Sequence, residues 1–418
     1  MPDLKLLFLQ MAVILATARL TAIAVRFVGQ PAVVGEMIAG LLLGPSFLGG
    51  IAPETWKALF PATGLGPLYA LSQLGLVLFM FLVGLDVRPG AARGLAKSVV
   101  ITSYASIAAP FLCGGLLAWE LYPHLGIDTS RLSFVLFLGA AMSITAFPVL
   151  ARILADRELM NTRVGVFAIS CAVVDDVTAW CLLALITIIA RPEVNHIPLP
   201  LRFAAIAVYI LAMLFLIRPL LRQLRPSGAS LGLGWFAAAM IFLLASVCAT
   251  EALGVHALFG AFLAGAVMPK GGKLEAEFRG HLESVTQVLL LPLFFAYTGL
   301  RTRVGLLNSA DAWLLCGLIV LVAVASKFAV SAACVRASGI PWRESLAVGV
   351  LVNTRGLVEL VILNAGLDLH ILSPTLFSIM VIMALATTLM TAPLIDCLLP
   401  LSLMRSAATP HELAGPKQ

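Results

Sequence analysis

The sequence predicts an all-α polytopic membrane protein with about 13 transmembrane helices, and both its composition and its spacing support this prediction. Hydrophobic residues make up 61% of the 418 residues and charged residues only 11%, which is too apolar for a soluble domain with a wetted surface. Apolar runs of bilayer-spanning length recur along the chain, separated by short loops. The net charge of +6 is spread over those loops without a basic stripe, which argues against nucleic-acid binding.

Thirteen apolar runs are predicted to be membrane helices, some of them short because a broken helix buried among others need not span the bilayer alone. The seven cysteines lie inside these runs without metal-ligand spacing, so no cofactor is expected. The predicted runs are 6–27, 31–49, 67–86, 97–119, 132–155, 164–190, 201–221, 231–249, 254–269, 284–300, 310–336, 344–366 and 375–399.

The charges in the loops predict the orientation. An odd number of spans puts the two termini on opposite sides, and most of the 27 Lys and Arg residues then fall in loops on the side of the C-terminus. By the positive-inside rule, the N-terminus is expected outside and the C-terminus in the cytoplasm. The chain is therefore predicted to be a multi-pass protein of the cell membrane, meaning a plasma or inner membrane.

Two segments of the chain echo each other seven helices apart. Residues 78–88 (LFMFLVGLDVR) and 293–303 (LFFAYTGLRTR) share Leu-Phe, Gly-Leu and Arg without a gap. Because seven is odd, the related helices would cross the membrane in opposite directions. That pattern is typical of inverted-repeat transporters, which bind their substrate near the midplane.

The same offset relates the run at 132–155 to the run at 344–366, and each contains residues that interrupt a helix. In the first run, Pro148 lacks an amide and biases the preceding residue away from helical geometry. In the second, Asn353 begins an Asn-Thr-Arg-Gly segment within apolar sequence. Two interrupted helices in matching positions indicate a transporter's binding site. The alternative for each one alone is a proline kink or a packing glycine.

Three charged residues lie deep in apolar runs. Asp175 and Asp176 are adjacent, and Lys327 is the only lysine well inside a run. Each unpaired charge costs roughly 2.5–3.5 kcal/mol at mid-bilayer, so a partner is required and Lys327 is the candidate. Adjacent helical positions point about 100° apart, so one aspartate is expected to pair with Lys327 while the other faces a water-filled cavity and exchanges a proton for a cation. The alternative, a purely structural bridge, explains one carboxylate but not two.

The predicted ligands of that cation are hard oxygen atoms, which alkali cations prefer. They are the carboxylates of Asp176 and Asp175, the hydroxyls of Thr145 and Ser170, and the backbone carbonyls freed around Ile144.

Other charged residues in the apolar runs are predicted to have structural roles. Arg355 and Glu359 are four positions apart and should pair on one helix face, with control of the broken helix as the functional alternative. Glu36, Glu251 and His256 are expected to be satisfied within the protein core, and for His256 the alternative is a pH sensor.

Together these motifs resemble the monovalent cation:proton antiporter-2 family, which has the NhaA/NapA-type fold. The resemblance covers essentially the whole membrane region. The segments that carry it are Pro31–Gly40 (PxxxGExxxG), the GxxxGP ending at Pro45, Phe81–Leu85 (FxxGL), Thr145–Pro148 (TAFP), the Asp-Asp pair, Gly254–Gly265 and Asn353–Glu359 (NTRGLVE).

The resemblance implies a homodimer with inverted repeats, in which a core subdomain with two crossed discontinuous helices moves against a dimerisation subdomain. It implies a transmembrane antiporter domain and a short cytoplasmic tail. Their bounds are 1–403 for the whole domain, helices around 132–190 and 310–366 for the core, helices including 6–49 and 201–269 for the dimerisation subdomain, and 404–418 for the tail.

In the Asp-Asp subgroup of this family, the first aspartate pairs with a lysine and the second binds the ion. The resemblance therefore implies that Asp175 pairs with Lys327 and that Asp176 binds the cation. It also implies electrogenic exchange of protons for Na⁺.

The sequence thus predicts secondary active antiport of Na⁺, or another monovalent cation, for H⁺ in pH and sodium homeostasis, with no enzyme activity. The alternatives are K⁺/H⁺ antiport, cation-coupled symport of an organic anion, and a sensor without flux. An intramembrane aspartyl protease is disfavoured, because its two aspartates must converge from different helices to share a proton.

Overall fold

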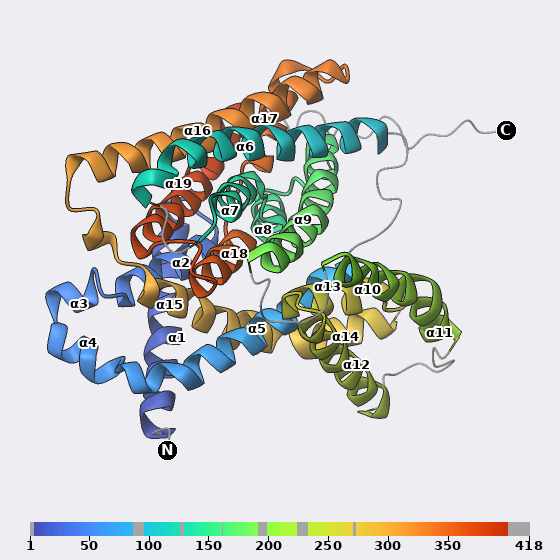
Figure 1. Cartoon of the computed structure of the whole chain (residues 1–418), viewed down its shortest axis with the longest axis horizontal. Coiled ribbons are helices and arrows are strands. Elements are labelled where there is room, and N and C mark those ends of the chain that lie inside the picture. Colours follow the sequence, from blue (N-terminus) through green and yellow to red (C-terminus); the bar gives the residue numbers. More distant parts are fainter. Residues whose placement is uncertain are drawn as a thin grey trace.

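The computed structural model describes residues 4–86, 96–125, 129–160, 162–190, 199–223, 233–270 and 273–399, and the regular elements in these ranges are all helices (Figure 1). The predicted tail at 404–418 lies outside the described residues. The α-helices are α1 (Leu4–Phe27), α2 (Ala32–Leu43), α3 (Leu48–Ile51), α4 (Pro53–Leu59), α5 (Leu65–Asp86), α6 (Ala96–Leu125), α7 (Arg131–Ser143), α8 (Phe147–Asp156), α9 (Arg163–Ala190), α10 (Leu199–Ala212), α11 (Arg218–Gln223), α12 (Leu233–Ala252), α13 (Ala257–Val267), α14 (Lys273–Val285), α15 (Leu291–Arg301), α16 (Ala310–Ala337), α17 (Trp342–Val352), α18 (Leu357–Asp368) and α19 (Pro374–Leu398).

The all-α membrane architecture predicted from the sequence is confirmed. Within the described residues, eleven helical stretches are long and apolar enough to cross a membrane, and two shorter apolar helices, α7 and α13, accompany them. The largest difference from a predicted boundary lies before residue 284. The helix predicted from 284 begins at Lys273, because α14 is rich in charged residues and a search for apolar runs misses it. A π-helical turn, Thr286–Leu290, then leads from α14 into α15.

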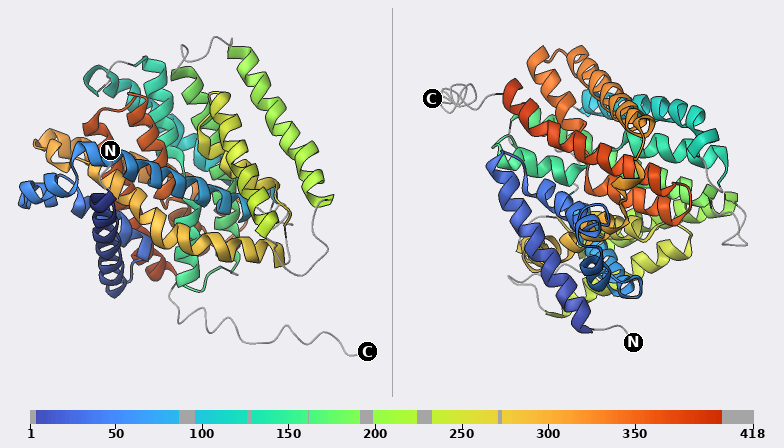
Figure 2. Two further views of the ribbon diagram at one scale, coloured as in Figure 1. Left: turned by 90° about the horizontal axis from the view of Figure 1, so that it is seen from below. Right: turned by 90° about the vertical axis from the view of Figure 1, so that its left-hand side faces the viewer.

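The helices form two groups that occupy different sides of the molecule in Figure 1 and in the right-hand view of Figure 2. We call the group of α6–α9 and α16–α19 the site bundle. In it α6 packs against α7 and α16, and α17 packs against α9, α16 and α19. We call the group of α1–α5 and α10–α15 the flanking bundle, in which α5 packs against α13 and α15, and α2 packs against α1 and α15.

Both predicted helix interruptions are present in the site bundle. Helix α7 ends at Ser143 and α8 begins at Phe147, with Pro148 in the first turn of α8, where its missing amide is tolerated. Helix α17 ends at Val352 and α18 begins after Gly356, whose φ of 154° favours glycine. A proline kink and a packing glycine are therefore wrong as complete explanations, because the helical hydrogen bonding stops at both places.

The two interruptions contact each other directly. The backbone amide of Ala146 donates to the carbonyl of Thr354 at 2.9 Å, and the hydroxyl of Thr145 donates to the carbonyl of Val352 at 2.7 Å. In a low-dielectric interior each unpaired backbone group would be costly, so the broken segments satisfy part of each other's hydrogen bonding.

Glycines allow close helix contacts in the flanking bundle, and two of these contacts involve the glycines of the sequence echo. A Cβ on Gly299 of α15 would collide with the backbone of Gly40 in α2, and a Cβ on Gly265 of α13 would collide with the backbone of Phe81 in α5, beside Gly84. Small residues let the helix backbones touch at these crossings. The sequence echo relates Gly84 to Gly299, so the paired contacts agree with an inverted repeat, which itself stays a prediction.

Candidate functional site

The charged residues predicted to meet in the membrane are buried at the interruption of the first broken helix. Lys327 on α16 lies 3.2 Å from Asp175 Oδ2 on α9, and both side chains are fully buried. Thr145, between α7 and α8, donates its hydroxyl to the same carboxylate oxygen at 2.5 Å. Oδ2 of Asp175 therefore has one charged and one neutral donor, and the side chain of Ser106 also interacts with this carboxylate.

Lys327 also neutralises the end of α7. Its ammonium group donates to the carbonyl of Ser143, the last residue of α7, and to the carbonyl of Ser106 at 3.3 Å. The last carbonyls of a helix have no partner within the helix and carry partial negative charge, so a cation there is stabilising. Lys327 thus joins α6, α7 and α9 to α16 through three acceptors.

Asp176 is placed very differently from its neighbour. Its side chain is only 1% exposed, yet neither carboxylate oxygen accepts a well-formed hydrogen bond within the described residues, although the backbone amide of Phe147 at the start of α8 interacts with the carboxylate. Asp176 lies beside a small cavity that is too narrow in this conformation to hold a water molecule. Val83 of α5 and Phe262 of α13, from the flanking bundle, line this cavity together with Phe147 and Val173 of the site bundle. Asp176 is therefore a buried acid with unpaired oxygens at the boundary between the two bundles, and it does not face lipid.

The predicted Arg355–Glu359 pair is present, at 3.5 Å, and both side chains are fully buried. The structure adds a role that the sequence did not suggest. The guanidinium of Arg355 donates to the carbonyl of Ala141 at 3.0 Å and to that of Met142. Arg355 lies in the interruption between α17 and α18, but it caps α7, which ends at the other interruption. Arg355 and Lys327 together therefore place two cations at the end of α7.

Ser170 is the predicted ligand that the structure does not bring to the site. Its hydroxyl donates to the carbonyl of Val166 one turn earlier, at 2.7 Å. Six positions separate Ser170 from Asp176, which places the two side chains about 120° apart around the axis of α9. Asn353, in contrast, is buried within the second interruption, and its side-chain oxygen has no hydrogen-bond partner in the described residues.

Two of the residues expected in the core have other roles. Glu251 is exposed and accepts a hydrogen bond from the backbone amide of Ala257 at 3.1 Å, so a satisfied core role was wrong for it. His256 is the N-cap of α13, and its Nδ1 accepts from the amide of Leu258 at 3.4 Å. Both residues satisfy amides at the start of α13, which have no partner within the helix.

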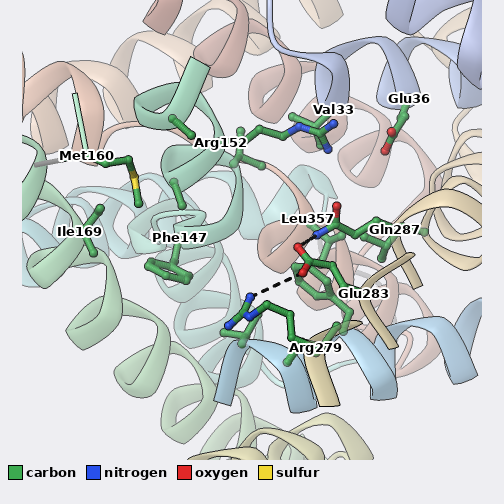
Figure 3. A pocket seen from close by; sticks show the side chains of 17 residues that line it. Val33, Glu36, Phe147, Arg152, Met160, Ile169, Arg279, Glu283, Gln287 and Leu357 are labelled. Atoms are coloured by element: carbon green, nitrogen blue, oxygen red, sulfur yellow. Dashed lines mark hydrogen bonds and ion pairs between the residues drawn. The ribbon is translucent and has the colours of Figure 1, made fainter. Parts of the chain in front are cut away.

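A cavity of about 620 Å³ lies along α8 (Figure 3). Both bundles line it, with Glu36 of α2 and Gln287 beside α15 on one side, and Arg152 of α8 on the other. Val83 and Phe147 line this large cavity and also the small cavity at Asp176. The Phe147 ring therefore stands between the large cavity and the buried carboxylate.

On the side where α18 ends, side-chain contacts tie the two bundles together. Arg301 of α15 pairs with Asp368 of α18 at 2.6 Å and donates to Asn364 Oδ1 at 3.1 Å. Asn364 in turn donates to the hydroxyl of Thr298 on α15 at 2.9 Å. The bundles thus enclose a cavity along α8 and are joined by polar contacts along α18.

Comparisons with known proteins agree with this architecture. The chain matches the family described as "Sodium/hydrogen exchanger, transmembrane" over residues 12–398. It is 42% identical over 402 residues to the Na⁺/H⁺ antiporter NhaS4 of Synechocystis sp., covering 95% of this chain and 98% of that protein. A solved structure of the sodium proton antiporter MjNhaP1 from Methanocaldococcus jannaschii has the same fold, with a TM-score of 0.62, 14% identity, and coverage of 94% and 97% of the two chains.

Longer relatives match over part of their length. The cation/H⁺ antiporter 17 of Arabidopsis thaliana is 37% identical over 94% of this chain, and the K⁺/H⁺ antiporter 1 of Saccharomyces cerevisiae is 31% identical over 99% of it. This chain spans about half the length of each, 48% and 49% respectively.

Proposed function

The chain belongs to the transmembrane sodium/hydrogen exchanger family, and we propose that it exchanges Na⁺ for protons across the membrane, with Asp176 as the group that binds each in turn. The observation that carries this assignment is the environment of Asp176, a buried carboxylate with two unpaired oxygens at the boundary between the bundles. An unpaired buried charge is strongly unfavourable, so the site favours binding either a cation or a proton.

The charge of the buried cluster supports exchange at this position. The cluster contains three carboxylates and two basic groups, all at most 1% exposed, namely Asp175, Asp176, Glu359, Lys327 and Arg355. With every group ionised it carries one net negative charge, which one monovalent cation or one proton neutralises. Because the same carboxylate accepts both, binding of one excludes the other, and this competition couples the two fluxes.

The oxygen atoms that would hold the cation are available at the site. Both oxygens of Asp176 and Oδ1 of Asp175 accept no well-formed hydrogen bond within the described residues. Carboxylate oxygens are hard ligands, which suit alkali cations. The hydroxyl of Thr145 supports the site indirectly, since it donates to Asp175 and fixes the orientation of that carboxylate.

We also propose electrogenic exchange, with Lys327 as a second proton carrier. Asp175 and Lys327 form a neutral pair. A cation that recruits Oδ1 of Asp175 competes with the lysine for this carboxylate, which weakens the hold on the lysine proton. Binding of one cation would then release two protons, one from Lys327 and one from Asp176. More positive charge would therefore leave the site than enters it.

Alternating access would then be a movement of the site bundle against the flanking bundle. The side chains around Asp176 come from both bundles, so a relative displacement changes which side of the membrane the carboxylate reaches. Breaking the contacts of Arg301 with Asp368 and Asn364 would be needed to open the α18 side. A homodimer, held through the flanking bundle, would provide the stationary frame.

The excess of basic residues in one set of loops supports placing the C-terminus in the cytoplasm of a plasma or inner membrane. In that orientation the cavity along α8 would open to the cytoplasm, because α8 runs from the buried site to Arg157, which belongs to the basic loops. The ties between α15 and α18 would then close the outside.

Transport by the purified protein tests the proposal. Proteoliposomes carrying an outward or inward pH gradient receive Na⁺, Li⁺ or K⁺, with and without a clamped membrane potential. Na⁺-dependent dissipation of the gradient that also responds to the potential is the expected result. A response to K⁺ alone would favour the K⁺/H⁺ alternative, which the yeast relative's name motivates, and no response to any cation would reject exchange.

A further inference from the structure

Four charged side chains line the cavity along α8, and two of them, Arg279 and Glu283, pair with each other. Arg279 lies 3.9 Å from Glu283, and Gln287 donates to Glu283 at 3.0 Å. Arg152 extends into the cavity from α8, as Figure 3 shows. Glu36 has no hydrogen bond or ion pair within the part of the chain that the structure describes, and its side chain is only 6% exposed.

Glu36 reaches the cavity from the opposite bundle to Arg152. It lies on α2, and the two side chains extend towards the same part of the cavity in Figure 3. The basic side chains that act on its carboxylate electrostatically are Arg152 and, more weakly, Arg19 of α1. No direct bridge forms with either of them, so the carboxylate remains available to a ligand in the cavity.

The position of Glu36 lies on the route to Asp176. The cavity that Glu36 lines also touches Phe147 and Val83, and these two residues line the small cavity at Asp176. A cation that enters along α8 therefore passes Glu36 and Arg152 before it reaches the Phe147 ring. Arg152 repels that cation, and an ionised Glu36 cancels the repulsion, so the cavity wall has two acids and two bases and no net charge.

We propose that Glu36 is a second binding site for the transported monovalent cation, a proposal that rests on the exchange function proposed above. Glu36 would bind the cation in the cavity before the cation passes Phe147 and reaches Asp176. A role confined to packing does not account for the carboxylate, because burying an acid without a partner is unfavourable in the apolar part of the bilayer. The neutral Gln would fill the same space at lower cost.

The test is a charge series measured as the cation dependence of exchange. Glu36→Gln leaves Arg152 uncompensated and is expected to raise the half-saturating Na⁺ concentration about tenfold, as expected for one charge acting over several ångströms at an intermediate dielectric. The maximal rate at saturating Na⁺ should change by less than about twofold, because the binding group at Asp176 is intact. Arg152→Gln should lower the half-saturating concentration. The double variant should recover only part of the affinity, because its wall is neutral again but the binding carboxylate is still absent.

Glu283→Gln is the matched control, since Glu283 lines the same cavity but is paired and 38% exposed, where solvent screens its charge. Its effect should be much smaller than that of Glu36→Gln. Equal effects would mean that only the overall charge of the wall matters, and would overturn a binding site at Glu36. Glu36→Asp, which keeps the charge, should stay within about threefold of the wild type.

The outcomes separate this proposal from the function on which it rests. If wild-type protein shows no exchange, the proposed function fails. If the wild type exchanges and Glu36→Gln leaves the half-saturating concentration unchanged, only the site at Glu36 fails. Recovery in the double variant excludes misfolding as the cause of a defect in Glu36→Gln, because a misfolded protein would not regain affinity by losing a second charge.

Discussion

The two interrupted helices are both broken for a few residues, but the two interruptions differ in their charges. The interruption between α7 and α8 contacts the interruption between α17 and α18, and each lasts only a few residues. The end of α7 receives two buried cations, Lys327 and Arg355. The end of α17 receives the hydroxyl of Thr145. Although both helices are interrupted, buried cations gather at only one of the two helix ends, that of α7.

The acids differ in the same way. In the second interruption Arg355 pairs with Glu359 of the same segment, so that this half is internally neutral. Beside the first interruption Asp175 is paired with Lys327, but Asp176 is left with unpaired oxygens. We infer that the second interruption mainly holds the structure together and that exchange is concentrated at the first.

Removing Lys327 should have the largest effect on stability. Lys327→Leu leaves Asp175 buried without its counter-ion, and breaking a buried pair in this way lowers the free energy of unfolding by about 3–5 kcal/mol. Denaturation of the purified protein in detergent measures this. Lys327→Leu combined with Asp175→Leu should recover much of the stability but not electrogenic exchange. Unchanged stability of the single variant would contradict a structural contribution from the pair.

The equivalent substitutions of the ion pair in the second interruption test whether the two interruptions differ in function. Arg355→Leu should also destabilise the protein by a few kcal/mol, because Glu359 loses its partner and the carbonyls at the end of α7 lose a donor. The double variant Arg355→Leu with Glu359→Leu should retain cation-dependent proton flux, measured in proteoliposomes. Loss of flux in a double variant that folds normally would mean that the second interruption takes part in exchange.

Substituting a threonine in either interruption should change the stability less than removing a buried charge does. Thr145→Val removes a hydroxyl that reaches both Asp175 and the carbonyl of Val352. It should lower the free energy of unfolding by about 1–3 kcal/mol and slow exchange. Thr354→Val is the matched control, because the Thr354 hydroxyl contacts Thr391 and neither aspartate. This variant should lower the free energy of unfolding by at most about 1 kcal/mol. Equal flux in the two variants would remove Thr145 from the site.

The positions of the interruptions could be predicted from the sequence because they are encoded locally. Pro148 cannot continue a helix, and Gly356 adopts a backbone conformation that favours glycine. Lys327 could be nominated as a partner because no other lysine lies well inside an apolar run. Which aspartate it contacts followed from the family resemblance, since adjacent carboxylates look alike in sequence.

Features that depend on packing between distant helices could not be predicted. Arg355 donates to backbone carbonyls of another helix, and no residue type marks such acceptors. The structure does not bring Ser170 to Asp176, because the two side chains point in different directions around α9, and proximity in sequence does not reveal that angle. The cavity that brings Glu36 opposite Arg152 exists only where the two bundles meet.

The most direct test of the account is sodium-dependent proton flux in Asp176→Ala, measured in proteoliposomes beside the wild type and Asp311→Ala, which removes an exposed acid from the first turn of α16. We predict that Na⁺ no longer dissipates the pH gradient in Asp176→Ala, whereas Asp311→Ala behaves as the wild type does. Wild-type flux through correctly inserted Asp176→Ala would contradict the claim that this carboxylate carries the exchanged ions.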